Sequence, residues 1–226
     1  MNTHPVILAL ETSGPLCSVA LMRQDGQLFT EEKIGERIHG EEITLMILRV
    51  LSEAGIEASH LNGVAVSSGP GSFTGLRVGL STAKGLCMAL NIPLLQPSTL
   101  EGLAKEARMR TKHSGPVLAV VKARVGEWYS ALYLEDNIRG VEARSITELS
   151  ELIQSVKDTV LLTGPDIQSL IVEMPVLEMS VLEVPLSSKW VLQLGIEEYH
   201  SGRFANLMLA EPNYIKPVRI TRPSSL

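Results

Sequence analysis

Apolar runs of strand length alternate with helical patterns along the first half of the chain. The strand-like runs are residues 6–10, 17–22, 26–34, 64–67 and 93–96. The spacing of apolar positions predicts a helix over 39–54 that ends at Gly55, and a second helix over 72–90. A third helix is expected to begin at Ser98, with Glu101 at the spacing of a capping box. Three consecutive strands followed by crossover helices indicate a mixed sheet with helices on its faces.

The second half of the chain repeats this order. Its strand-like runs are residues 117–121, 127–134, 138–144, 160–162 and a run near Val181. We expect Thr147 to cap a helix that runs to about Lys157, and another helix over 187–200. Both halves therefore follow the order β-β-β-α-β-α. This order predicts an α/β protein with two lobes, residues 1–110 and 111–226, each built on a mixed sheet.

Composition excludes several classes of protein. Of the 226 residues 45% are hydrophobic, which is enough to build a core and argues against a disordered chain. The net charge of −5 and the aromatic content of 4% argue against a protein that binds nucleic acid by itself. We expect no membrane span and no secretory signal. The 2 cysteines lack the spacing of a metal site, so we expect a cytoplasmic protein with buried, reduced thiols.

Two polar turns at strand ends are candidate vestigial phosphate loops. Their residues are Glu11, Thr12 and Ser13 in the first turn, and Gly69, Gly71 and Ser72 in the second. A glycine-rich turn between a strand and a helix brings backbone N–H groups close to an anion. The second turn lacks the acidic partner of a dinucleotide site and the Lys-Ser or Lys-Thr of a Walker A motif. The same glycines would also allow a tight turn with close helix–sheet packing, and both interpretations stay open.

The two long helices carry an apolar or small-residue face in addition to their core stripe. On the first helix, Leu45 and Leu48 fall opposite the core stripe, where a solvated helix is usually polar. The second helix adds a stripe of mostly small residues, which are Val78, Thr82, Gly85 and Ala89. Either neighbouring elements of the same chain cover these faces or another protein does. Because two adjacent helices both carry such a face, a partner interface is favoured.

Several segments resemble a known family. In the first half they are VILALETSGPLCSVAL at 6–21, VSSGPGSFTGLRVGLSTAKG at 66–85 and PSTLEGLA at 97–104. The second half adds ARVGEWY at 123–129 and EPNYIK at 211–216. Over nearly its full length the chain resembles the TsaB family, also called YeaZ. One departure is Lys122, which stands where the family usually has Asp.

The resemblance implies a two-lobed fold of the actin-like ATPase, or ribonuclease H-like, class. It also implies a non-catalytic subunit, with no cofactor of its own, of the complex that forms threonylcarbamoyladenosine beside the anticodon of tRNAs. The family works with a catalytic paralogue, TsaD, and an ATPase, TsaE, so tRNA contact is expected only through the complex. TsaD holds its metal through two His, and those positions fall here on Thr99 and Leu103. Because Leu103 has no donor atom, we expect neither a metal site nor a catalytic residue.

Two alternatives remain at this stage, and both are enzymes of the actin-like class. One is a metallopeptidase-like enzyme, which would require a tightly bound metal. The other is a nucleotide-binding enzyme that uses Glu11, Thr12 and the turn at 69–75.

A further expectation concerns the oligomeric state of the isolated chain. An exposed apolar helix face without its partner tends to self-associate, so we expect a homodimer when the chain is alone.

Overall fold

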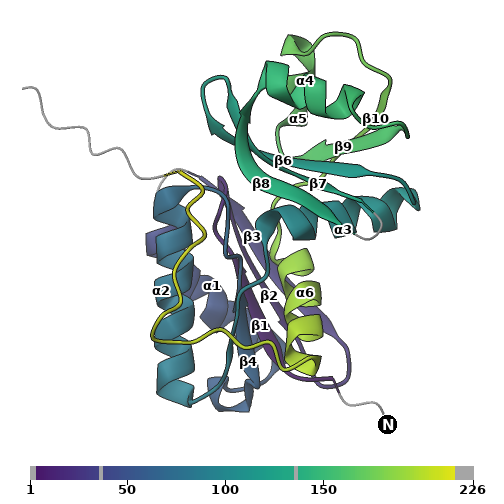
Figure 1. Cartoon of the computed structure of the whole chain (residues 1–226). Coiled ribbons are helices and arrows are strands. Elements are labelled where there is room, and N and C mark those ends of the chain that lie inside the picture. Colours follow the sequence, from purple (N-terminus) through teal and green to yellow (C-terminus); the bar gives the residue numbers. More distant parts are fainter. Residues whose placement is uncertain (1–3, 36–37, 135–136, 217–226) are drawn as a thin grey trace, which may run out of the picture.

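The first lobe is built on a five-stranded mixed sheet. The computed structural model describes residues 4–35, 38–134 and 137–216 (Figure 1). The strands of this lobe are β1 (Ile7–Glu11), β2 (Leu16–Met22), β3 (Leu28–Ile34), β4 (Gly63–Val66) and β5 (Leu94–Leu95). Their order is β3-β2-β1-β4-β5, with β1 antiparallel to β2 and parallel to β4. The central strand β1 is buried along its whole length.

The second lobe repeats the plan of the first. Its strands are β6 (Val117–Arg124), β7 (Glu127–Tyr133), β8 (Ile138–Ser145), β9 (Val160–Gly164) and β10 (Met179–Glu183). Their order is β10-β9-β6-β7-β8, and β6 is antiparallel to β7 and parallel to β9. The central strand β6 therefore has the place that β1 has in the first lobe. The predicted fold class, an α/β protein with two lobes of duplicated order and mixed sheets, is confirmed.

The helices alternate with the later strands of each lobe. They are α1 (Ile38–Ala54), the short 3-10 helix η1 (Ala58–His60), α2 (Phe73–Leu90), α3 (Thr99–Thr111), α4 (Ile146–Gln154), α5 (Ile167–Glu173) and α6 (Ser188–His200). Gly55 follows α1 with a φ of +65°, a left-handed conformation that glycine adopts without strain, so the predicted end of this helix is confirmed. Within the described ranges, no helix has the length and apolar character that crossing a membrane requires.

One predicted helix cap is wrong, and a second lacks its predicted hydrogen bonds. Ser145, not Thr147, caps α4: its hydroxyl accepts a hydrogen bond from the backbone N–H of Glu148, whose carboxylate accepts one from the N–H of Ser145. The helix ends at Gln154, before Lys157 is reached. The third helix does begin after Ser98, but the Ser98 side chain makes no capping hydrogen bond. The predicted capping box at that helix is therefore absent.

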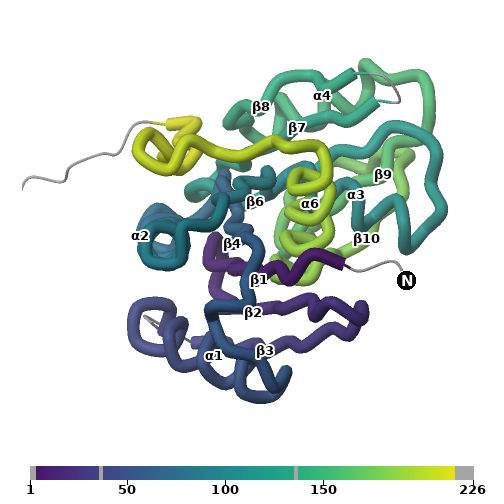
Figure 2. Tube along the Cα trace, turned by 90° about the horizontal axis from the view of Figure 1, so that it is seen from below, coloured from purple at the N-terminus to yellow at the C-terminus, as the bar shows by residue number. Residues whose placement is uncertain are grey.

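Three apolar clusters lie between alternating layers of helix and sheet. The alternation of side chains along β1 divides it between two of them: Leu8 and Leu10 pack under α1 and α2, whereas Ile7 and Ala9 face α3 and α6. The central cluster continues onto one face of the second sheet, and the other face of that sheet packs under α4 and α5. Figure 2 shows α1 and α2 together on the outer side of the first sheet, with α3 and α6 on the other side.

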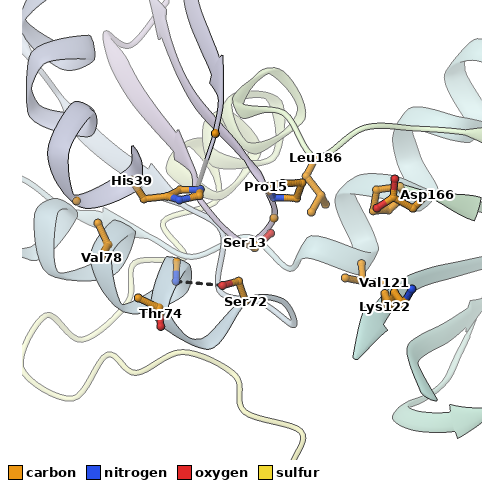
Figure 3. Close-up of a pocket in the computed structure, with 15 residues that line it drawn as sticks. Ser13, Pro15, His39, Ser72, Thr74, Val78, Val121, Lys122, Asp166 and Leu186 are labelled. Carbon is orange, nitrogen blue, oxygen red and sulfur yellow. Dashed lines mark hydrogen bonds between the residues drawn. The ribbon is translucent and has the colours of Figure 1, made fainter. Parts of the chain in front are cut away.

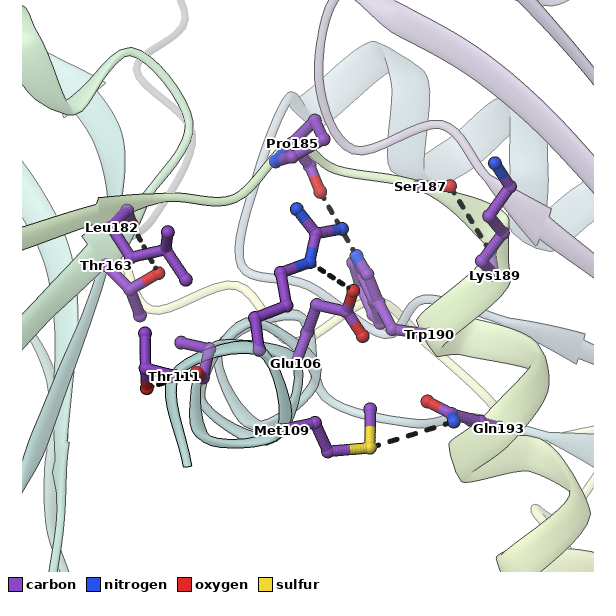
Figure 4. A network of polar contacts seen from close by, with 12 residues as sticks. Glu106, Met109, Thr111, Thr163, Leu182, Pro185, Ser187, Lys189, Trp190 and Gln193 are labelled. Carbon is purple, nitrogen blue, oxygen red and sulfur yellow. Dashed lines mark hydrogen bonds and ion pairs between the residues drawn. The ribbon is translucent and has the colours of Figure 1, made fainter. Parts of the chain in front are cut away.

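Helix α6 covers the first sheet although it comes from the end of the chain (Figure 1). Gly195 allows this approach, because a Cβ at this position would lie 2.6 Å from the Cβ of Ala65 in β4. Figure 4 shows the junction of α6 with α3, where the Trp190 indole donates a hydrogen bond to the carbonyl of Pro185 and Gln193 contacts Met109. The division into 1–110 and 111–226 stays a prediction, and α6 joins the two segments in space.

The segment after α6 returns along α2 as a strap of residues 203–216 (Figure 1). The Lys84 ammonium in α2 donates hydrogen bonds to two carbonyls of this strap, at 3.2 and 3.4 Å. Farther along, Arg77 donates to the Tyr214 hydroxyl, and the Tyr214 ring lies 5.0 Å from that of Phe73. At its end, Lys216 forms an ion pair of 2.7 Å with Glu127 of β7. The strap therefore connects α2 with the second lobe.

Candidate functional site

The main candidate site is a cleft of about 750 Å³ between the two lobes. One wall comes from the β1–β2 turn, the start of α1 and the start of α2 (Figure 3). The opposite wall comes from the end of β6, the β9–α5 turn and the link before α6. Figure 3 places His39, Ser72, Thr74 and Val78 on the first wall and Val121, Lys122 and Asp166 on the second. Loops at the carboxyl ends of strands therefore line the cleft, as in other α/β proteins.

The two candidate phosphate loops pack directly against each other at this cleft. The N–H of Ser72 donates a 2.6 Å hydrogen bond to the carbonyl of Ser13, and the Thr12 hydroxyl donates to the carbonyl of Gly75 at 2.8 Å. A Cβ at Gly71 would lie 2.5 Å from the Ser13 carbonyl oxygen, and one at Gly75 would overlap the Thr12 carbonyl oxygen. These contacts favour close helix–sheet packing as the reason for the glycines.

The Glu11 carboxylate uses a hydrogen-bond donor of the first loop itself. Its side chain is fully buried, and one carboxylate oxygen accepts hydrogen bonds from the N–H of Ser13 at 2.6 Å and from the Ser67 hydroxyl at 3.0 Å. The other oxygen has no partner among the described residues. Burial raises the pKa of Glu11 above its usual value, and the hydrogen bonds oppose this only in part. Donors that a phosphate would require are therefore already used by the protein.

This environment predicts a pH-dependent effect of Glu11→Gln. A carboxyl group whose pKa is higher in the folded than in the unfolded protein stabilises the fold at low pH and loses this contribution as pH rises through the folded pKa. Glutamine resembles the protonated acid and does not ionise. The free energy of unfolding of Glu11→Gln, relative to the unmodified chain, is expected to increase from pH 5 to pH 8 in urea titrations. A difference that stays constant with pH would contradict the raised pKa.

Not every residue of the candidate loops faces the other loop. Gly69 has a φ of +103°, and its carbonyl accepts a hydrogen bond from the N–H of Thr99. A Cβ on Gly69 would lie 3.0 Å from the Leu76 side chain and 3.3 Å from the Asn213 carbonyl oxygen of the strap. Glu11, Thr12, Ser13, Gly71 and Ser72 are thus brought together, whereas Gly69 supports the turn from behind.

The two positions at which the family resemblance would place a His pair lie on the buried side of α3. Thr99 and Leu103 are both fully buried. Within the described ranges, no group of three or more His, Cys, Asp or Glu side chains is placed to hold a metal ion.

The predicted buried thiols are confirmed, because Cys17 and Cys87 are buried and unpaired. Burial raises the pKa of each thiol to about 11. These thiols are therefore protonated at neutral pH.

The outer faces of α1 and α2 remain open in the described chain. Leu45 is 48% exposed and Leu48 is 58% exposed. In α2, Gly85 and Ala89 are exposed, and a Cβ on Gly85 would have no atom within 4 Å. Val78 and Thr82 of the predicted stripe are half-buried. Met88, 64% exposed on the same helix, is a further exposed apolar side chain outside the predicted stripe.

Four cleft residues were not predicted as a group. His39, Asp166 and Leu186 belong to segments far apart in the sequence and have no motif of their own. In the sequence, Lys122 stands out only as a departure from the family pattern, and in the structure it lines the cleft at the end of β6. No local pattern relates these residues, because the packing of one lobe on the other brings them together.

Comparisons with known proteins agree on one family. The family model described as "TsaD: tRNA N6-adenosine threonylcarbamoyltransferase" matches residues 32–189. A protein of Escherichia coli is 38% identical over 58% of this chain and 55% of its own length. A protein of Buchnera aphidicola is 34% identical over 67% of this chain and 73% of its own length. Both are named tRNA threonylcarbamoyladenosine biosynthesis protein TsaB.

The chain belongs to the TsaB family, also called YeaZ, within the group that the TsaD model describes. The match spans little more than half of the E. coli protein's length.

Solved structures agree with this family. YeaZ from Pseudomonas aeruginosa has a TM-score of 0.80 at 26% identity and covers 93% of this chain and 99% of its own. A second structure, described as an uncharacterised protein with similarity to peptidase YeaZ from the same organism, has a TM-score of 0.83 at 25% identity, over 94% of this chain and 100% of its own. The likeness to YeaZ structures therefore extends over both lobes.

Proposed function

We propose that this chain is a non-catalytic subunit in the biosynthesis of tRNA threonylcarbamoyladenosine, working in the cytoplasm. In this proposal it supports a TsaD-like catalytic paralogue together with a TsaE-like ATPase and meets tRNA only through that complex. The names of the TsaB relatives support the pathway. The match of a TsaD family model over residues 32–189 supports a common ancestry with the catalytic paralogue.

The observation that carries the non-catalytic role is the environment of Thr99 and Leu103. Both side chains are fully buried in α3, and Leu103 packs with the cluster that joins the two lobes. A His pair at these positions would have to reach the cleft to bind a metal and a substrate. Instead, the space is filled by the core. Only one hydroxyl oxygen, on Thr99, is available there, and it is buried. The chain thus lacks the ligands that the catalytic paralogue uses.

We assign the contact with the TsaD-like partner to the outer faces of α1 and α2. Leu45 and Leu48 supply exposed leucines, and the open surface at Gly85 allows another helix to approach closely. The partner is related by fold, so its corresponding helices offer a similar surface. A pair of helices from each chain would then bury both apolar faces. The homodimer expected of the isolated chain would use the same face and compete with the partner.

Reconstitution with purified proteins tests the role. Threonylcarbamoyl-adenylate and unmodified tRNA are incubated with the TsaD-like and TsaE-like proteins of the same organism, with and without this chain. Threonylcarbamoyladenosine, measured by mass spectrometry of tRNA nucleosides, is expected only when this chain is present with the TsaD-like protein. The chain by itself is expected to give no product.

The same preparation separates the two enzyme alternatives. A stoichiometric, tightly bound transition metal in the purified chain, together with hydrolysis of peptides, would favour a metallopeptidase. Micromolar binding of magnesium ATP by the chain alone, measured by calorimetry, would favour a nucleotide-binding enzyme. Formation of the modified nucleoside at the same rate without this chain would contradict the proposed function.

A further inference from the structure

Three large apolar side chains are exposed where the strap lies along the second half of α2. Met88 of α2 is 64% exposed, and Met208 and Leu209 of the strap are each 77% exposed. We call these three residues the strap patch. Their neighbours in the strap face inward, because Leu207 packs against the core of the first lobe and Ala210 is buried. The strap patch is therefore the outer side of a segment whose inner side is already packed.

Contacts along α2 bring the strap patch together. The strap begins beside the end of α2, and its Tyr214 reaches the Phe73 ring at the start of that helix, so the two segments run antiparallel. Between these points, the Lys84 ammonium donates a hydrogen bond to the carbonyl of Met208 at 3.4 Å. Met88 lies one helical turn beyond Lys84, on the same side of the helix. The apolar side chains of the strap therefore lie next to the exposed methionine of α2.

A hydrogen-bonded turn fixes the backbone of Met208 and Leu209. The side-chain carbonyl of Asn206 accepts hydrogen bonds from the N–H groups of both residues, at 3.0 and 3.2 Å. The backbone carbonyl of Asn206 accepts another from the N–H of Ala210 at 2.8 Å. A surface that is ordered before its partner arrives loses less conformational entropy on binding. The turn thus presents two apolar side chains in a fixed arrangement.

The strap patch continues the outer faces of α1 and α2. Met88 follows Gly85 by three positions, so the two residues are neighbours on the surface of α2. Figure 2 shows α1, α2 and the strap side by side along one side of the molecule. Leu45 and Leu48 on α1, the open surface at Gly85 and the strap patch therefore lie on that side. Exposed apolar surface that extends over neighbouring elements is typical of a protein–protein interface.

We propose that the TsaD-like partner binds the strap patch together with the outer faces of α1 and α2. This inference rests on the proposed function, from which it takes the partner. A chain that covers the open surface at Gly85 also reaches Met88, and from there the two apolar residues of the strap. Methionine side chains adapt to the shape of the surface that they meet. The strap is then a third element of the interface, and the partner's surface that meets it is apolar.

Calorimetric titration with the TsaD-like protein of the same organism tests this inference on the full chain. Met208→Asp with Leu209→Asp is expected to weaken partner binding about 30-fold, because both carboxylates would lie unpaired against an apolar surface. The backbone N–H groups that bond Asn206 are retained, so the urea midpoint of unfolding is expected to stay unchanged. The matched control is Val172→Asp with Val176→Asp, at exposed positions of the second lobe, which is expected to bind like the unmodified chain.

Photocross-linking adds a measurement of proximity that does not depend on affinity. Benzoylphenylalanine in place of Met208 is expected to cross-link to the TsaD-like protein on illumination. The same group in place of Val172 is expected to give no cross-link. Absence of the cross-link at Met208 in a mixture that contains the complex would overturn the inference.

The titrations separate the failure of this inference from the failure of the proposed function. If the unmodified chain binds the partner and the Met208→Asp, Leu209→Asp variant binds it within threefold as tightly, the inference is overturned and the proposed function stands. If that variant loses self-association but keeps partner binding, a second copy covers the strap patch, which also overturns the inference. If the unmodified chain does not bind the partner at all, the proposed function is contradicted and the inference is overturned with it.

Discussion

Replacing Leu45 and Leu48 together by Asp is expected to weaken binding of the TsaD-like partner by at least about 100-fold. The two leucines are 48% and 58% exposed on the outer face of α1, so their replacement leaves the core of the chain unchanged. If the partner covers this face, each Asp would bury an unpaired carboxylate in an apolar interface, which costs several kcal/mol. Size-exclusion chromatography of the mixed proteins and calorimetric titration measure the loss.

A matched pair on the other lobe provides the control. Val172 and Val176, at the end of α5 and just after it, are 85% and 104% exposed, and neither lies on α1 or α2. Val172→Asp with Val176→Asp therefore introduces the same charges at exposed apolar positions and is expected to bind the partner normally. Both double variants are expected to unfold within about 0.5 kcal/mol of the unmodified chain, because all four positions are exposed. Equal binding by the two variants would contradict the assignment of the face.

Two glycines in the same helix are expected to respond in opposite directions to replacement by alanine. A Cβ at Gly75 would overlap the carbonyl oxygen of Thr12, which is backbone and has little room to move. Helix α2 would have to shift away from the β1–β2 turn and lose the hydrogen bond from the Thr12 hydroxyl to the Gly75 carbonyl. Gly75→Ala is therefore expected to destabilise the fold by about 1–3 kcal/mol, the usual cost of overpacking.

Gly85→Ala is the matched control for this prediction. Here a Cβ would meet no atom within 4 Å, so only the helix propensity changes. Alanine is favoured over glycine inside a helix by about 0.5–1 kcal/mol, and the variant is expected to be more stable by that amount. Urea titrations followed by circular dichroism measure both free energies of unfolding. Destabilisation by Gly85→Ala similar to that by Gly75→Ala would show that α2 is crowded along its whole length.

A larger substitution at Gly85 tests whether this glycine serves partner binding rather than packing within the chain. Gly85→Leu is expected to keep the fold and to weaken the TsaD-like partner's binding, because the larger side chain prevents close approach of a helix at this point. The two helix glycines were equally visible in the sequence. Their different roles became visible only when the atoms around each were known.

Much of the fold could be predicted from the sequence because each lobe depends on strong local patterns. The run of apolar residues in β1 and the periodicity of α1 and α2 indicate their elements directly, and the repeated order indicates two mixed sheets. Helix α5 was missed because it is only 7 residues long and buries only Ile167 and Leu170, which is too little to form a period. The cap of α4 was misplaced because Ser145 and Thr147 are both good capping residues, and only the contact with Glu148 distinguishes them.

The cleft could be predicted only in part. The loops that line its first wall are visible as polar turns after strands, and of the residues named in these loops Ser13 and Ser72 line the cleft. The second wall depends on how α6 and α3 hold the lobes together, through contacts such as that of Gly102 with the Trp190 ring. Such contacts join positions about 90 residues apart, and no pattern in the sequence relates them. The same holds for the strap, in which Tyr214 meets Phe73 and Arg77.

Depletion of this protein in its own organism, followed by mass spectrometry of tRNA nucleosides, tests the central claim most directly. The account predicts loss of threonylcarbamoyladenosine on depletion. The modification is expected to return with the unmodified chain and with the Val172→Asp, Val176→Asp variant, but not with the Leu45→Asp, Leu48→Asp variant. Normal levels of the modified nucleoside after complete depletion would contradict the account.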